Sequence, residues 1–177
     1  MSNVLLLTGP PGSGKTTVAR LVATDAPRPT VHVTTDEFYR AIRTGFVAPW
    51  LAEAQHQNEV VMDVIVAAVG AYADGGYDVV VDGVIGPWFL APFRAVAGDW
   101  RMSYVVLRPD LHTTLRRGQA RGGVELTDVD ALTGMHGVFA DLGELESHAI
   151  DTSTLDPAAT AAAVRKAVAS GDYLLSA

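Results

Sequence analysis

Residues 9–16 read GPPGSGKT, and only Thr8 separates them from the short apolar run of residues 4–7. An uninterrupted apolar run is typical of a strand that is buried on both faces of a parallel sheet. Residues 15–23, after the glycine-rich stretch, have the apolar spacing of a helix. The order strand, glycine-rich loop, helix is the context in which the pattern G-x-x-x-x-G-K-[ST], the Walker A motif, binds phosphate. The stretch therefore predicts an α/β fold with a polyphosphate site at its first turn.

Each fixed position of the Walker A pattern in this loop is expected to make a different contact with the nucleotide or its metal ion. Consecutive backbone N–H groups between Gly12 and Lys15 can point into one concavity, because glycine permits the required dihedral angles and the helix N-terminus adds partial positive charge. Lys15 is expected to reach the β and γ phosphates of ATP, and Thr16 to place its hydroxyl on Mg²⁺. The residues predicted to contact the nucleotide are Gly9, Gly12, Ser13, Gly14, Lys15, Thr16 and Thr17.

Length and composition favour a single domain over residues 1–177. A chain of 177 residues can bury one sizeable core around a central sheet. Hydrophobic residues make up 49% of the sequence and charged residues 19%, which is typical of an ordered globular protein. We therefore expect one domain without a disordered tail.

Charge and residue composition limit the substrates, the chemistry and the cellular location that the sequence allows. The net charge of -7 disfavours a nucleic acid as substrate. The sequence has no cysteine, so its chemistry must rely on oxygen and nitrogen groups. No apolar run is long enough to span a bilayer, and the N-terminus lacks a basic, cleavable leader. These features predict a cytoplasmic protein without a membrane partner, and we expect a monomer or a homodimer.

Strand and helix patterns alternate along the rest of the chain. Further strands are expected at residues 30–33, 79–81, 103–107 and 149–151. Helices are expected at residues 34–43, 53–71 and 110–120, from about 127–130 onward, and at 157–171. The helix over 53–71 is predicted from an apolar stripe formed by Val60, Val61, Val64, Ile65, Ala68 and Val69. The alternation predicts a three-layer α/β/α sandwich, in which ligands gather beyond the carboxyl ends of the strands.

Polar signals also follow the later strands. Asp36 comes after the second strand, Asp82 and Gly83 after the third, and Arg117 and Arg121 after the fourth. The sequence lacks the Asn-Lys-x-Asp motif that recognises guanine and the Leu-Ser-Gly-Gly-Gln signature of transporter ATPases. It is also too short to include a separate lid domain of the AAA+ type. Together with GPPGSGKTTVAR at residues 9–20, this layout resembles the small P-loop kinases. That group includes nucleoside monophosphate kinases, shikimate and gluconate kinases, and the chloramphenicol phosphotransferase type.

The resemblance has implications for both fold and function. It implies a five-stranded parallel sheet of order 2-3-1-4-5. It also implies ATP- and Mg²⁺-dependent transfer of the γ-phosphoryl group to a hydroxyl of a small metabolite or antibiotic. In adenylate kinases, the Asp-Gly pair is followed by a phenylalanine-proline-arginine stretch that helps to hold the acceptor phosphate. Here Val84-Ile85-Gly86-Pro87-Trp88 follows instead, which makes a nucleoside monophosphate acceptor less expected.

Two carboxylates are candidates for the chemistry. Asp36 lies where such kinases often carry an acid that accepts the proton of the attacking hydroxyl, so we hypothesise that it is the general base. Its alternative role is to cap the following helix. Asp82 is placed like the Walker B acid that holds Mg²⁺ through a water, and it could also bond the hydroxyl of the acceptor. Its alternative role is that of a turn residue at the strand end.

An arginine cluster follows the fourth strand. Arg117 and Arg121 are four residues apart on the predicted helix, so they share a face and could close over the transferring phosphoryl group. Residues 116–127 would form this short lid, with Gly122 and Gly123 as its hinge. Arg116 could be the inward-pointing member instead, and all three could simply be solvated.

The acceptor pocket is predicted from scattered polar and aromatic residues. Two Pro-Trp pairs could supply apolar walls, and the polar run of residues 55–58 could hydrogen-bond a hydroxylated acceptor. The candidate acceptor contacts are Arg40, Trp50, Gln55, Asn58 and Trp88. Each of them could also be a core, turn or solvated surface residue. Four histidines have no metal-ligand spacing, so no zinc site is predicted; they are His56, His112, His136 and His148.

Two other functions remain open from the sequence. ATP binding could change the affinity for a partner without turnover, as in a nucleotide-sensing regulatory module. Alternatively, the protein could be a nucleotide kinase, with Arg40, Arg43 or Arg94 recognising the acceptor phosphate.

Overall fold

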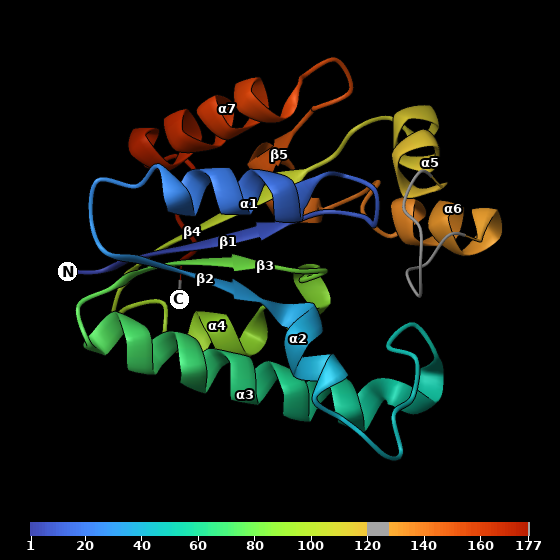
Figure 1. Ribbon diagram of the computed structural model, residues 1–177, viewed down its shortest axis with the longest axis horizontal. Coiled ribbons are helices and arrows are strands. Elements are labelled where there is room, and N and C mark those ends of the chain that lie inside the picture. The colour runs from blue at the N-terminus through green and yellow to red at the C-terminus, as the bar shows by residue number, and fades with distance from the viewer. Residues whose placement is uncertain (120–127, 177) are drawn as a thin grey trace.

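The five predicted strands form one parallel sheet (Figure 1). The structure is a computed structural model, and it describes residues 1–119 and 128–176. The strand order is β2-β3-β1-β4-β5. The strands are β1 (Asn3–Thr8), β2 (Thr30–Thr34), β3 (Asp78–Asp82), β4 (Arg101–Leu107) and β5 (Ala149–Ile150). The predicted fold class and strand order are therefore confirmed.

Helices cover both faces of this sheet. In Figure 1, α1 and α7 lie above it, and α3 and α4 lie below it. The helices are α1 (Lys15–Thr24), α2 (Thr35–Arg40), α3 (Gln55–Asp74), α4 (Ala91–Ala95), α5 (Leu111–Gln119), α6 (Val129–Gly137) and α7 (Pro157–Ser170). Short 3₁₀ turns are η1 (Ala52–Ala54), η2 (Pro87–Phe89) and η3 (Gly143–His148). This arrangement is the predicted three-layer sandwich.

The central strand β1 contributes side chains to two separate hydrophobic cores, one on each face of the sheet. Successive side chains of a strand point to opposite faces, so a continuous apolar run can fill both sides of the sheet. Leu5 and Leu7 pack with α1 and α7, whereas Val4 and Leu6 pack with α3 and α4. The phosphate loop that leaves β1 is therefore mounted on a strand that is fixed from both sides.

The apolar stripe predicted for α3 is partly wrong. Val61, Ile65 and Val69 are buried as predicted, but Val60 is 48% and Val64 50% exposed. Neighbouring residues of a helix lie about 100° apart around its axis, so 60 and 64 lie beside the face that meets the sheet. The buried residues of α3 outside the predicted stripe are Asn58, Met62, Gly70 and Ala73.

The helix that carries Asp36 is shorter than predicted. It ends at Arg40 rather than near residue 43, and its last turn closes through hydrogen bonds from Ala41 N to Glu37 O and from Ile42 N to Tyr39 O. The caps of α7 match the sequence pattern, because Asp156 accepts from Ala159 N and Gly171 has a positive φ of 83°. Among the described residues, no helix has the length and apolarity needed to cross a membrane.

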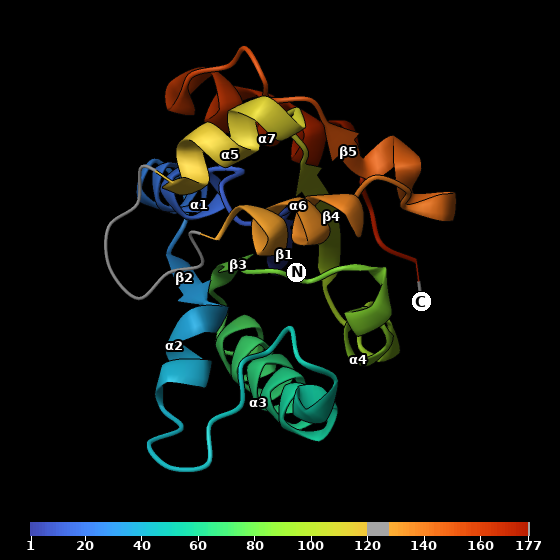
Figure 2. The ribbon, with the colours of Figure 1, turned by 90° about the vertical axis from the view of Figure 1, so that its right-hand side faces the viewer.

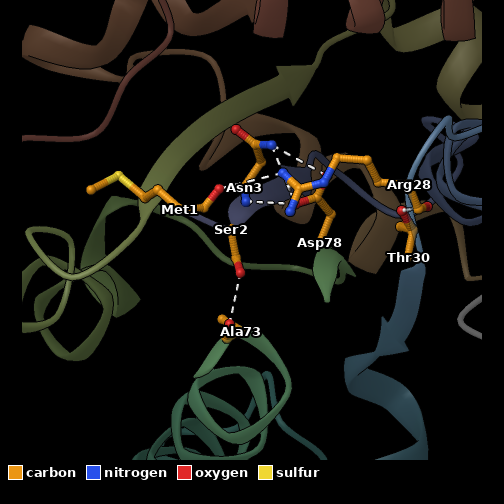
Figure 3. Close-up of polar contacts among 7 residues, drawn as sticks. All are labelled: Met1, Ser2, Asn3, Arg28, Thr30, Ala73 and Asp78. Atoms are coloured by element: carbon orange, nitrogen blue, oxygen red, sulfur yellow. Dashed lines mark hydrogen bonds and ion pairs between the residues drawn. The ribbon is translucent and has the colours of Figure 1, made fainter. Parts of the chain in front are cut away.

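A polar network joins the amino ends of the strands, at the edge opposite the phosphate loop (Figure 3). Asp78 accepts hydrogen bonds from Asn3 N at 2.8 Å and from Asn3 Nδ2 at 3.2 Å, and it pairs with Arg28 at 3.4 Å. Ser2 Oγ donates to the Ala73 carbonyl at the end of α3. These bonds tie β1 to β3 and to α3, so the strands keep their register at the end that carries no predicted chemistry.

Candidate functional site

The carboxyl ends of the strands bring together most of the residues singled out in the sequence. Figure 2 looks onto this edge. The loop of residues 9–14 leaves β1, α2 starts directly after β2, and α5 follows β4. Parallel strands end at one edge of the sheet, so residues far apart in the sequence meet there.

The phosphate loop has the geometry of an anion cradle. Gly9, Gly12 and Gly14 have positive φ angles of 143°, 88° and 87°. A Cβ on Gly12 would lie 2.5 Å from the Thr114 carbonyl oxygen of α5, so that position excludes other residues. Ser13 Oγ is buried and has no hydrogen-bond partner among the described residues. A phosphate oxygen would supply the partner that this hydroxyl lacks.

Lys15 lies against the same loop. Its side chain is only 7% exposed, and its Nζ donates to the Pro10 carbonyl oxygen at 3.5 Å. Lys15 is also the first residue of α1, so its charge stands at the positive end of that helix. The charge, the helix end and the backbone N–H groups all favour a bound anion at one point.

The two predicted Mg²⁺ residues contact each other. Thr16 Oγ1 donates to Asp82 Oδ1 at 2.9 Å, although the residues are 66 positions apart. The contact arises because Asp82, the last residue of β3, pairs in register with Leu7 of β1. A hydroxyl and a carboxylate are hard oxygen donors, and Mg²⁺ uses one or two such protein ligands together with phosphates and water. The residues present therefore fit the metal that the fold implies.

A histidine that the sequence analysis did not single out joins this pair. Asp82 Oδ2 contacts His32 Nε2 at 2.9 Å and accepts from Thr34 Oγ1 at 3.3 Å. Both residues lie on β2, whose register places Thr34 beside Asp82. His32 has no motif or spacing around it. The one available signal is the alternation of β2, which puts residues 32 and 34 on the same face once β2 is known to neighbour β3.

Asp36 stands in the first turn of α2 at the same edge. Its side chain is exposed, while the adjacent Thr35 is 2% exposed. Burial, and secondly the negative charge of Asp36, raise the pKa of Tyr39 to about 12. The negative charge of Asp36 therefore acts on the Tyr39 hydroxyl, which is protonated at neutral pH with or without this shift.

Gly83 controls how closely α2 approaches the end of β3. A Cβ built on Gly83 would lie 2.0 Å from Thr35 Oγ1 and 2.4 Å from Thr35 Cγ2. No side chain fits in that space unless the start of α2 moves. The distance between the segment that carries Asp36 and the segment that carries Asp82 therefore depends on a glycine at this position.

Substitution Gly83→Ala is expected to lower the rate of the phosphoryl transfer predicted from the sequence by about tenfold or more, because displacement of Thr35 also moves the neighbouring Asp36, the predicted general base. The measurement is the steady-state rate together with the thermal unfolding midpoint. Gly98→Ala is the matched control, since a Cβ there meets nothing within 4 Å. Equal rates in the two variants would contradict the role given to the Gly83–Thr35 contact.

Arg117 borders a cavity beside the phosphate loop. Its Nη2 donates to the carbonyl oxygens of Leu155 at 3.2 Å and Thr152 at 3.4 Å. The cavity has a volume of about 310 Å³ and is lined by residues of the loop and α1, by Arg117 and by the segment entering α7. This position is beside the phosphate loop, and the predicted contact of Arg117 with the transferring phosphoryl group stays a prediction. Arg121, the Gly122–Gly123 hinge and the rest of the predicted lid after residue 119 lie outside the described residues.

The polar run that opens α3 does not act as one surface. Asn58 is 4% exposed, and its Nδ2 donates to the Pro49 carbonyl at 2.8 Å. Gln57 donates to Val47 O and accepts from Val47 N. Gln55, by contrast, is exposed and bonds Glu59 on the same helix. Asn58 and Gln57 therefore hold the loop before α3.

The other candidate acceptor contacts are exposed. Trp50 is 55% and Trp88 47% exposed. Trp88 packs its ring edge-on against Phe139, with 5.6 Å between ring centroids, so one aromatic wall is held in place. Arg40 forms a surface ion pair with Glu37.

An apolar groove of about 410 Å³ runs between α2 and α3. Its walls include Phe38 of α2, Ile42 just after that helix, and Val60 and Val64 of α3. Asp36 is about 200° around the helix from Phe38, so its side chain leaves α2 on a different side. The groove is therefore separate from the edge where the phosphate loop and the carboxylates gather.

Comparison with known proteins gives one family and several solved structures that share the fold of this chain. A family model described as chloramphenicol phosphotransferase-like protein matches residues 2–169. Curated proteins include no significant match to this sequence. Similar solved structures include a sugar kinase from Janibacter sp., with a TM-score of 0.70 and 16% identity over 96% of this chain and 95% of that chain.

Two further structures cover nearly the whole chain. A tunicamycin resistance protein from Deinococcus radiodurans has a TM-score of 0.69 and 19% identity over 100% of this chain and 99% of that chain. A shikimate kinase from Acinetobacter baumannii, in complex with shikimate, has a TM-score of 0.67 and 22% identity over 97% and 95%. At these identities the likeness establishes a shared fold.

Proposed function

Because this chain belongs to the family of chloramphenicol phosphotransferase-like proteins, we propose that it is an ATP- and Mg²⁺-dependent kinase. It transfers the γ-phosphoryl group to a hydroxyl of a small molecule, either a metabolite or an antibiotic. The observation that carries this proposal is the hydrogen bond of 2.9 Å between Thr16 and Asp82 beneath the phosphate loop. That contact joins the two side chains that hold the metal in P-loop enzymes.

Each residue of the site has a different role in the proposed phosphoryl transfer. Asp36 takes the proton of the acceptor hydroxyl, whose oxygen then bonds the γ-phosphorus. The bond between that phosphorus and the bridging oxygen breaks, and ADP leaves with the electron pair. Lys15 and the loop N–H groups stabilise the charge that develops on the phosphate oxygens. Thr16 and Asp82 would hold Mg²⁺, which would neutralise part of the charge of the phosphates.

The donor nucleotide would extend from the loop towards Arg117. The cavity of about 310 Å³ adjoins Gly12, Ser13 and Gly14, so a nucleoside attached to the bound phosphates would enter it. Arg117 is held there by two carbonyl groups, which leaves the flat face of its guanidinium to stack on a base. We therefore assign Arg117 to nucleotide binding, with contact to the phosphoryl group as the alternative.

The acceptor would lie between Asp36 and the exposed aromatic side chains. Trp88 is the best-supported contact, because Phe139 holds its ring while nearly half of it stays exposed. Trp50 and Arg40 are further candidates. Asn58 is proposed to act by holding the Pro49 carbonyl, and so the loop that carries Trp50.

The proposal is tested by incubating the protein with ATP, Mg²⁺ and a panel of hydroxylated acceptors, each offered with and without an existing phosphate group. We expect at least one phosphate-free acceptor to accelerate ADP release well above slow hydrolysis. Stimulation by nucleoside monophosphates alone would favour the nucleotide kinase. If ATP binds but no acceptor accelerates its use, the protein is a nucleotide-binding module instead.

A further inference from the structure

The carboxylate of Asp82 is held from two sides, by side chains of β2 and by a side chain of α1. Its Oδ1 accepts from Thr16, and its Oδ2 faces His32 and Thr34. Asp82 itself is 1% exposed. A carboxylate so deeply buried requires hydrogen-bond donors on both oxygens, because water cannot supply them.

We propose that His32 is a positioning residue for the metal site, which acts through Asp82. A carboxylate accepts hydrogen bonds and does not donate them, so Nε2 of His32 is the donor at 2.9 Å. This bond occupies Oδ2 and fixes the rotation of the carboxylate. Oδ1 is then left facing the Thr16 hydroxyl, whose oxygen is the predicted metal ligand.

The geometry makes His32 the stronger of the two β2 contacts. Thr34 Oγ1 lies 3.3 Å from Oδ2, compared with 2.9 Å for His32, and a hydroxyl can rotate to other acceptors. The imidazole is fixed on a strand whose register with β3 is set by five paired residues. His32 is therefore a rigid donor, and residues that orient a ligand from behind in this way commonly change metal affinity by about 10- to 100-fold.

This inference rests on the proposed use of Mg²⁺ at Thr16 and Asp82, but its test does not require phosphoryl transfer. The affinity for an ATP analogue is measured by calorimetry in Mg²⁺ and again in EDTA. The wild-type chain is compared with His32→Leu, which removes the donor, and with His32→Gln, whose amide nitrogen can donate to the same oxygen. Thr34→Val is the matched control on the same strand.

We expect His32→Leu to weaken nucleotide binding about tenfold in Mg²⁺ and to leave binding in EDTA within about twofold of wild type. His32→Gln should recover most of the Mg²⁺-dependent affinity, and Thr34→Val should change it less than His32→Leu does. The ratio of the two affinities is the readout, because a general loss of folding would lower both.

Three results would overturn the inference. His32→Leu could keep the full Mg²⁺ effect, it could lose affinity equally in Mg²⁺ and EDTA, or the wild-type chain could bind the nucleotide without any Mg²⁺ effect. The proposed function fails separately, if the wild-type chain binds nucleotide normally and phosphorylates no acceptor.

Discussion

Lys15→Ala is expected to abolish phosphoryl transfer and to weaken ATP binding, with a loss in turnover of at least about 10²- to 10³-fold. Lys15 is 7% exposed and sits where the loop and the start of α1 converge. Its point charge is the part of the cradle that can follow the β and γ phosphates. Alanine is the best helix former, so α1 should keep its first turn without the charge.

The comparison variant is Lys166→Ala. Lys166 is the other lysine of the sequence and lies exposed on α7. It carries the same charge away from the phosphate loop, so its removal should leave nucleotide affinity and turnover within about twofold of wild type. Calorimetry with ATP and a coupled assay for ADP release measure the two effects. Normal ATP binding by Lys15→Ala would remove the basis for placing the phosphates in this loop.

Asp36→Asn is expected to reduce kcat by roughly 100-fold or more, while ATP affinity changes little. The amide keeps the size and the hydrogen-bonding reach of the carboxylate but cannot accept the hydroxyl proton. Asp36 is exposed at the first turn of α2, outside the phosphate loop, so the nucleotide has no reason to lose affinity. The measurement is kcat for the acceptor found in the panel, with the nucleotide Kd determined in parallel.

Glu37→Gln is the natural control for Asp36→Asn. Glu37 is the next residue, it is also exposed, and it pairs with Arg40 on the surface of the helix. It should change kcat by less than about threefold, because an exposed ion pair of this kind contributes little. If Asp36→Asn and Glu37→Gln behave alike, Asp36 is only an acidic residue of the first turn of α2, and the regulatory module becomes the better interpretation of the bound nucleotide.

Most of the fold could be predicted from local patterns. The five strands and the caps of α7 agree with the prediction, because apolar runs, glycine pairs and capping residues act over a few positions. The order of the strands also agrees, but it was implied by the resemblance to the small P-loop kinases and not by local patterns. The stripe of α3 was harder to predict, since valine is apolar on either side of a helix. Val60 and Val64 face outward, while polar Asn58 is buried against the loop before the helix. Only the packing partners of α3 distinguish these positions.

The positions of most residues of the candidate site could be predicted from the sequence, but the hydrogen bonds between their side chains could not. Four of the predicted residues lie at one edge of the sheet, because each is at the end of a strand or at the start of the helix that follows a strand. They are Lys15, Thr16, Asp36 and Asp82. His32 carries no such positional signal. Asn58 was predicted to contact the acceptor, but its amide nitrogen binds the Pro49 carbonyl. Hydrogen bonds of that kind depend on side-chain direction, which periodicity does not encode.

The sequence by itself determined the phosphate loop and the alternation of strands and helices, because GPPGSGKT and the apolar runs around it act through neighbouring residues. Only the tertiary structure established that His32, Asp82 and Thr16 form one hydrogen-bonded chain. These residues are separated by 50 and 66 positions. They meet because β3 lies between β2 and β1, so that the last residue of β3 is within hydrogen-bonding distance of a strand on one side and of the start of α1 on the other.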